Sequence, residues 1–119
     1  MALAQVGLGT ITVVNANQTT TVYTVGSGQT AFVRGVVIHS QDVDNTIQSE
    51  VHYVPNVGGS AGAASTNTRL AVLGISTTDT YFLEWTYPIT MSNNGDTIQV
   101  RNHSTQKALN VIVLGDREL

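Results

Sequence analysis

The sequence predicts an all-β protein: a single antiparallel β-sandwich of about eight strands with a jelly-roll-like arrangement. Runs of Val, Ile, Thr, Tyr and Phe recur along the 119-residue chain, at roughly the spacing typical of short strands. Most runs are closed by Gly, Asn, Asp or Ser, which favour turns. No stretch carries the apolar period of a helix. Regular short strands separated by turns are typical of antiparallel sandwiches and barrels.

Eight segments combine a β-favouring composition with neighbouring turn signals. They span residues 10–14, 19–25, 30–40, 46–54, 69–76, 80–87, 97–102 and 107–114. Ile89 and Met91, after Pro88, are expected to add a short further piece. The strongest turn signal is residues 93–96 (NNGD), because Asn-Gly favours a tight hairpin.

Alternation of side chains justifies the first three strands. In segment 10–14, Ile11 and Val13 share a face, and segment 19–25 ends at a Gly-Ser-Gly turn. Segment 30–40 alternates over its whole length. Its predicted faces are Phe32, Val36 and Ile38 on one side, and Val33, Val37 and His39 on the other.

Segment 46–54 divides into an apolar and a polar face. The apolar face carries Ile47, Val51 and Tyr53, and the polar face carries Gln48, Glu50 and His52. Such a split indicates one buried face and one face that is wet or shared with a partner. Pro55 ends the strand, since proline cannot donate a ladder hydrogen bond. A long loop of small residues, 56–68, follows.

The last four segments complete the count. Segment 69–76 is apolar, and in segment 80–87 the side chains of Tyr81, Leu83 and Trp85 share a face. Segment 97–102 points Ile98 and Val100 inward and Thr97, Gln99 and Arg101 outward. Segment 107–114 is apolar on both faces, so we expect it to be central or covered on both sides.

The composition indicates a surface that faces other proteins. Only 11% of the residues are charged, whereas about a quarter is usual. Interface cores are depleted in charge, although an ordinary extracellular β domain is the alternative. No internal repeat or linker is present, so we expect one domain, residues 10–119, preceded by an N-terminal arm, residues 1–9.

Charge and hydropathy exclude two classes of partner. The net charge is −3 and Lys107 is the only lysine, so the clustered cations that displace phosphate counterions are missing and nucleic-acid binding is not expected. The apolar runs are too short to span a bilayer, and the N-terminus lacks the features of a secretory signal. There is no cysteine, so no disulfide holds the fold.

Candidate chemistry is sparse. His39 and His52 flank a predicted hairpin centred near Asn45, where two imidazoles could share a metal or form a pH switch with Glu50 nearby. We favour two exposed or interface histidines, because metal sites show more convergent ligands. Residues 42–45 are interpreted as a polar turn rather than a calcium loop. We therefore predict no catalytic residue, no cofactor and no metal, and no enzyme.

Several stretches together resemble a group of small β-sandwich virion proteins of tailed bacteriophages. In order along the chain they are TVYTVGSGQTAFVRGVVIHS, VHYVPNVGGSAG, DTYFLEW, NNGDTIQVRN and ALNVIVLGDREL. The family pattern has a "VYTVP-x-G-x-T" turn, and the proline after "VYTV" is Gly26 here. The likeness covers about residues 19–115, and the order and spacing of the motifs carry it.

This resemblance implies a structural protein of the virion, and a capsid decoration or cement protein bound to the major capsid protein is the expected role. It also implies a homo-oligomer, with a trimer favoured, and localisation in the virion. The elements expected to make protein contacts are the arm, the small-residue loop, the tail and the two histidines. The residues chosen are Leu3, Val6, Leu8, His39, His52, Val57, Arg117 and Leu119.

Two alternatives remain open. The first is a tail or fibre-associated adaptor protein, since members of the family occupy head, tail and fibre positions. The second is a carbohydrate-binding module in which Tyr81, Trp85 and Tyr87 form a platform for sugar rings. For these three aromatics we favour burial in the sandwich, because large aromatics dominate cores.

Overall fold

The computed structural model describes residues 3–4, 8–57 and 60–118 and contains only strands and connections within them. Its strands are β1 (Leu3–Ala4), β2 (Thr12–Val14), β3 (Thr19–Thr24), β4 (Thr30–Ser40), β5 (Ile47–Val54), β6 (Asn56–Val57), β7 (Ser60–Ala61), β8 (Arg69–Ile75), β9 (Thr80–Met91), β10 (Thr97–Asn102) and β11 (Leu109–Glu118). Within these ranges there is no helix with the length and hydropathy needed to cross a bilayer.

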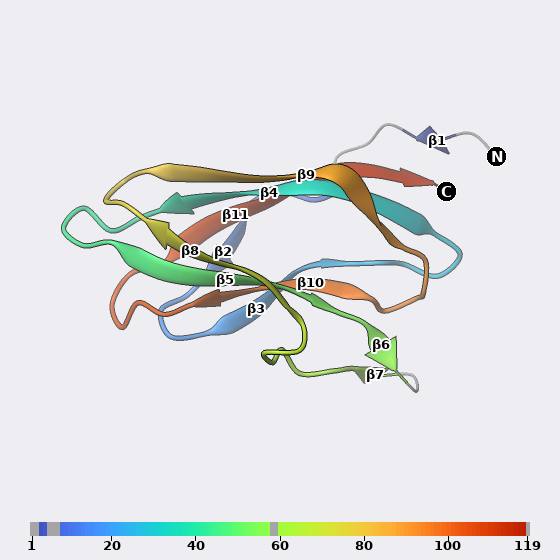
Figure 1. The fold of residues 1–119 in the computed structure, drawn as a ribbon, viewed down its shortest axis with the longest axis horizontal. Coiled ribbons are helices and arrows are strands. Elements are labelled where there is room, and N and C mark those ends of the chain that lie inside the picture. The colour runs from blue at the N-terminus through green and yellow to red at the C-terminus, as the bar shows by residue number, and fades with distance from the viewer. Residues whose placement is uncertain (1–2, 5–7, 58–59, 119) are drawn as a thin grey trace.

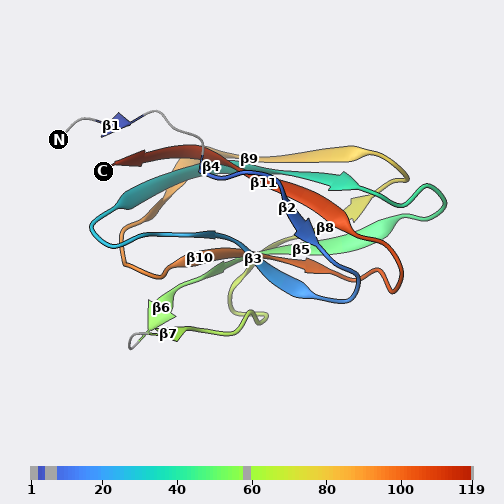
Figure 2. The same ribbon diagram turned by 180° about the vertical axis from the view of Figure 1, so that it is seen from behind.

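Nine of the strands form two antiparallel sheets, of five and four strands, that pack face to face (Figures 1 and 2). Sheet I has the order β2-β11-β4-β9, and β1 pairs with the same side of β11 as β2 does, at its other end. Sheet II has the order β3-β10-β5-β8, and β6 and β7 form a small separate ladder. The predicted all-β sandwich is therefore confirmed.

The pairing follows one long hairpin that has been rolled up. Four antiparallel ladders join β2 to β11, β3 to β10, β4 to β9 and β5 to β8, so the first half of the chain runs back along the second half. Consecutive strands such as β4 and β5 lie in opposite sheets. This is the topology of a jelly roll, as the sequence predicts.

The core lies between the sheets and is built from aliphatic side chains. Its largest fully buried members are Ile38, Ile47, Ile75, Met91, Ile98 and Leu109. The predicted inward residues of segments 46–54 and 97–102 all face this core, with Tyr53 only partly buried against it. Because β-branched residues suit the pleated surface of a sheet, the same side chains that favour strands also fill the interior.

A break in strand register corrects the predicted faces of segment 30–40. In the ladder with β11, Gly35 pairs with Leu114 and Val33 pairs with Gly115, so Arg34 is an extra residue that changes the phase of alternation along β4. Val33 and Val36 are both fully buried, whereas Phe32 is only partly buried. The expectation that Phe32 shares a face with Val36 is therefore wrong.

Two predicted hairpins are also wrong, because the chain crosses between sheets at both turns. The turn at residues 41–45 joins β4 in sheet I to β5 in sheet II, and residues 93–96 join β9 in sheet I to β10 in sheet II. The turns themselves are present. Asp42 Oδ1 accepts hydrogen bonds from the backbone N–H of Asp44 and Asn45, and these bonds lower the pKa of Asp42. Gly95 has a φ of 92°.

Two strands are longer than expected. β9 continues through Pro88 to Met91 as a single strand, and β11 extends to Glu118. The predicted central position of the last strand is confirmed, because β11 pairs with β4 on one side and with β1 and β2 on the other. Its outer face is only partly covered, since the Leu114 side chain is 37% exposed.

Candidate functional site

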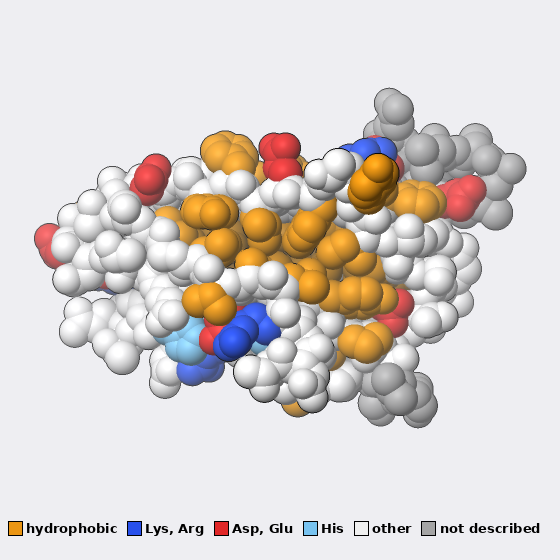
Figure 3. All heavy atoms as spheres, viewed as in Figure 1, with side chains coloured by type: hydrophobic (Ala, Val, Ile, Leu, Met, Phe, Trp, Pro, Cys, Tyr) orange, Lys and Arg blue, Asp and Glu red, His pale blue; other side chains and the backbone are white. Residues whose placement is uncertain are grey.

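Exposed apolar side chains gather on the two strands that end the sheets on one side of the sandwich. Nine large hydrophobic residues are exposed among the described residues, and five of them belong to β8 or β9. We call these five the edge surface: Leu70, Val72, Tyr81, Phe82 and Tyr87. Figure 3, viewed as in Figure 1, shows hydrophobic side chains spread across this side between the two strands.

Residues next to the edge surface reach the core. Half-buried Ala71, Leu83, Trp85 and Ile89 pack against the buried cluster from the same two strands. In the part of the chain that the structure describes, β8 and β9 each pair with only one strand. The outer backbone groups of both strands are therefore open to pairing, and the apolar side chains beside them are incompletely covered.

Charge is nearly absent from these two strands. The 7 residues of β8 and the 12 residues of β9 include only two charged side chains, Arg69 and Glu84. Edge strands that stay solvated usually carry charges that discourage association. The edge surface therefore has the apolar, charge-poor character of an interface core.

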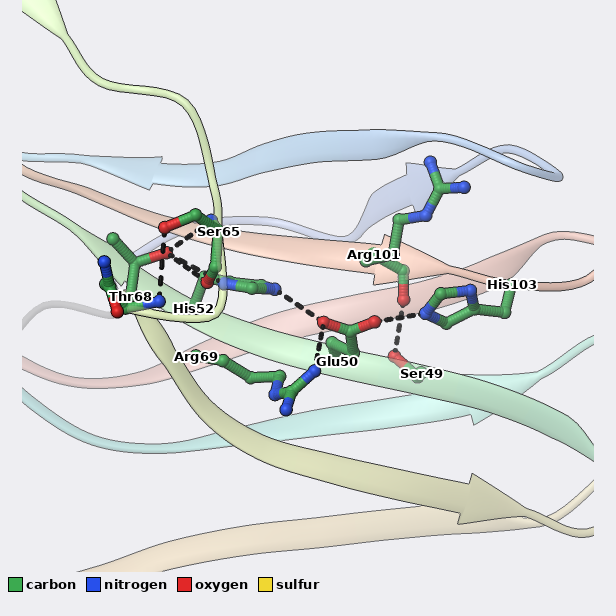
Figure 4. Close-up of polar contacts among 9 residues, drawn as sticks. Ser49, Glu50, His52, Ser65, Thr68, Arg69, Arg101 and His103 are labelled. Carbon is green, nitrogen blue, oxygen red and sulfur yellow. Dashed lines mark hydrogen bonds and ion pairs between the residues drawn. The ribbon is translucent and has the colours of Figure 1, made fainter.

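A polar cluster centred on Glu50 lies on the outer face of sheet II (Figure 4). One carboxylate oxygen is 3.1 Å from Nε2 of His52 and 3.6 Å from Nη1 of Arg69. The other oxygen is bonded to Nε2 of His103. His52 also contacts the Thr68 hydroxyl through Nδ1 at 3.0 Å, which holds the loop after β7 against the sheet.

The cluster holds Glu50 in its ionised form. Burial acts to raise the pKa of the Glu50 carboxyl, but the hydrogen bonds and charges of His103 and His52 outweigh it, and the pKa lies below its ordinary value. Both oxygens already accept from neighbouring side chains, so Glu50 is not a free general base. Its contacts instead join β5 to β8, to the end of β10 and to the loop.

A polar cleft of about 300 Å³ opens beside the cluster, lined by Glu50, His52, Arg101, Thr19 and the loop residues Ala64, Ser65 and Thr66. The guanidinium of Arg101 donates to the backbone oxygen and side-chain Oδ1 of Asn17. No group of three or more His, Cys, Asp or Glu side chains suited to a metal ion occurs within the described ranges.

The structure separates the two histidines that the sequence placed opposite each other. His39 lies on β4 in sheet I, where Nδ1 contacts the Thr80 hydroxyl at 2.9 Å, whereas His52 lies on β5 in sheet II. The shared site fails because β4 and β5 do not pair. His52 is also only 3% exposed, so it is covered by its own chain rather than open to a neighbour.

None of the other predicted contact residues that the structure describes belongs to β8 or β9. Leu8 is 3% exposed and belongs to the hydrophobic core, which corrects its assignment as a contact. Arg117 is partly buried and lies near Tyr23. The backbones of Leu3 and Val57 belong to β1 and β6, and Val6 and Leu119 fall outside the described residues.

The sequence places Tyr81 and Tyr87 in a candidate sugar platform, but it does not single out Leu70, Val72 or Phe82. Burial of Tyr81 and Tyr87 was expected, but their side chains are 39% and 83% exposed, because β9 is the last strand of its sheet. The aromatic density of β9 and its single acidic residue were the available signals. No protein-family model matches the chain, and no curated protein matches it.

Proposed function

We propose that this protein is a structural component of a virus particle, and specifically a capsid decoration or cement protein of a tailed bacteriophage. The observation that carries the proposal is the edge surface, five exposed apolar side chains on β8 and β9, the two charge-poor strands that end the sheets. The likeness of the sequence to small virion proteins and the jelly-roll topology support the same role.

Interface burial is the mechanism of the proposed role. Groups of exposed apolar side chains on monomeric proteins mark sites of association. A standard protein interface removes roughly 1,200–2,000 Å² from water. If each copy buries its edge surface against the major capsid protein, many copies together stabilise the shell. Open strand edges on β8 and β9 add backbone hydrogen-bond donors and acceptors for the same contact.

The copy number of the chain in purified particles tests the proposal. Particles of the phage that encodes the chain would be purified on a density gradient and analysed by quantitative mass spectrometry, with the major capsid protein as internal standard. A copy number comparable with that of the shell subunits is expected. A few copies per particle would favour a tail or fibre-associated adaptor, and absence of the chain from particles would exclude a virion role.

A further inference from the structure

The register break between β4 and β9 creates a cleft on sheet I. Val33 pairs with Ile89 and Gly35 pairs with Glu84, so the four residues 85–88 stand opposite the single residue Arg34. A side chain at position 35 would place its Cβ 2.5 Å from the backbone oxygen of Leu83. Glycine therefore allows the two strands to approach closely at one end of the bulge.

The bulge opens a cleft of about 340 Å³ lined by Arg34, Glu84, Trp85 and Leu114. Trp85 is half-buried, and part of its side chain packs against the core. Tyr87, in the same bulged segment, is 83% exposed. Four of the seven aromatic residues of the chain lie in β9, so the cleft occupies the most aromatic part of the molecule.

The polar groups at this cleft are open to a ligand. Glu84 is exposed, and among the described residues it has no hydrogen bond or ion pair. Arg34 has a side chain that is 58% exposed, and its Nε donates to Asp116 at 3.3 Å. The two terminal nitrogens of Arg34 therefore remain available as donors, while Glu84 offers two acceptor oxygens.

An apolar wall with one donor group and one acceptor group matches the chemistry of a sugar. Trp85 and Leu114 provide the apolar wall, and sugar hydroxyls both donate to a carboxylate and accept from a guanidinium. The three charges at the cleft, on Arg34, Glu84 and Asp116, sum to −1. This balance disfavours anionic ligands, and it favours a neutral saccharide over an acidic one.

We propose that the cleft formed by Arg34, Glu84, Trp85 and Leu114 is a binding site for neutral saccharides. This inference goes beyond the proposed function, because it concerns a ligand-binding cleft rather than a protein interface. Its test uses the purified protein and needs no virus particle. A particle protein with such a site would add an attachment to surface glycans to its role in assembly.

Trp85 makes the test specific, because it is the only tryptophan in the chain. The purified protein would be titrated with cellohexaose, chitohexaose and hexagalacturonate at millimolar concentration, following tryptophan fluorescence and confirming affinity by calorimetry. We expect at least one of the two neutral hexamers to shift the fluorescence in a saturable way, and the acidic hexamer to bind more weakly.

Two variants and a matched control complete the test. Glu84→Ala and Arg34→Ala should each weaken binding about tenfold, the effect of losing a hydrogen bond to a charged group. Asp44→Ala removes an exposed carboxylate from the turn between β4 and β5 and should leave binding unchanged. Circular dichroism would confirm that all three variants fold.

Three results would overturn the saccharide site: no binding of either neutral hexamer, tighter binding of the acidic hexamer, or equal affinities for the two cleft variants and the parent protein. None of them would affect the virion proposal, which depends on copy number in particles.

Discussion

At the scale of single residues, Glu50 is the centre of the polar cluster on sheet II. It accepts hydrogen bonds from His52 and His103 and forms an ion pair with Arg69, and through them it connects three elements of sheet II and the loop after β7. Sequence alternation predicted the outward direction of Glu50 and His52 correctly. It could not predict the cluster, because Arg69 and His103 reach Glu50 only after the sheet has assembled.

The lowered pKa of Glu50 gives the cluster a defined pH dependence. The Glu50 carboxyl takes up a proton more readily in the unfolded chain than in the folded one. Its contribution to the free energy of unfolding is therefore fully present above the pKa of the unfolded state, and it is lost as the pH falls through the pKa of the folded state. Glu50→Gln should lower the free energy of unfolding by about 1–3 kcal/mol at pH 7, the range for a lost charged hydrogen bond.

Thermal unfolding from pH 7 down to pH 3 measures this effect. The difference between Glu50→Gln and the parent protein should shrink as the pH falls below the ordinary glutamate value of 4.5. Glu84→Gln is the matched control, since Glu84 is exposed and without a partner among the described residues. A difference that is constant with pH would show that the carboxylate charge does not hold the cluster together.

At the scale of elements, the register break at Arg34 shows where periodicity ceases to predict structure. Alternation assigns faces correctly along β5 and β10, where few residues are inserted. Along β4 it fails at Phe32, because Arg34 is an extra residue of β4 against β11 and shifts the alternation between Val33 and Val36. The signal for this break is Gly35 within a strand rich in β-branched residues, since an isolated glycine in a strand often marks a bulge.

Gly35→Ala tests whether close approach at the bulge is required. The new Cβ would lie 2.5 Å from a backbone oxygen, which cannot move without disturbing the ladder, so we expect a loss of about 1–3 kcal/mol in the free energy of unfolding. Gly74→Ala on β8 is the control, because its Cβ would meet Thr46 at an ordinary 3.8 Å. Urea titration of both variants provides the measurement, and equal midpoints would contradict the role of Gly35.

At the scale of the whole molecule, strand count and fold class followed from the sequence, but the pairing of strands in space did not. Turn chemistry at residues 41–45 and 93–96 suggested hairpins, yet the chain uses both turns to cross between sheets. Turn residues report local backbone conformation, whereas the choice of sheet depends on how both halves of the chain bury their apolar faces together. This choice also decided that β8 and β9 would be edges.

The exposure of that edge leads to a prediction about assembly rather than folding. Phe82 is 64% exposed, so Phe82→Ser removes little buried area. It should change the free energy of unfolding by no more than about 0.5 kcal/mol, as a surface substitution does. If the edge surface binds the shell, the same substitution should strongly reduce the amount of protein that co-sediments with shells lacking it. Val43→Ser is the matched control, because Val43 is also 64% exposed but lies in the turn between β4 and β5. Equal co-sedimentation of Phe82→Ser and Val43→Ser would place the contact with the shell elsewhere. Loss of binding confined to Phe82→Ser would show that the edge surface, rather than the arm or the tail, attaches the protein to the shell.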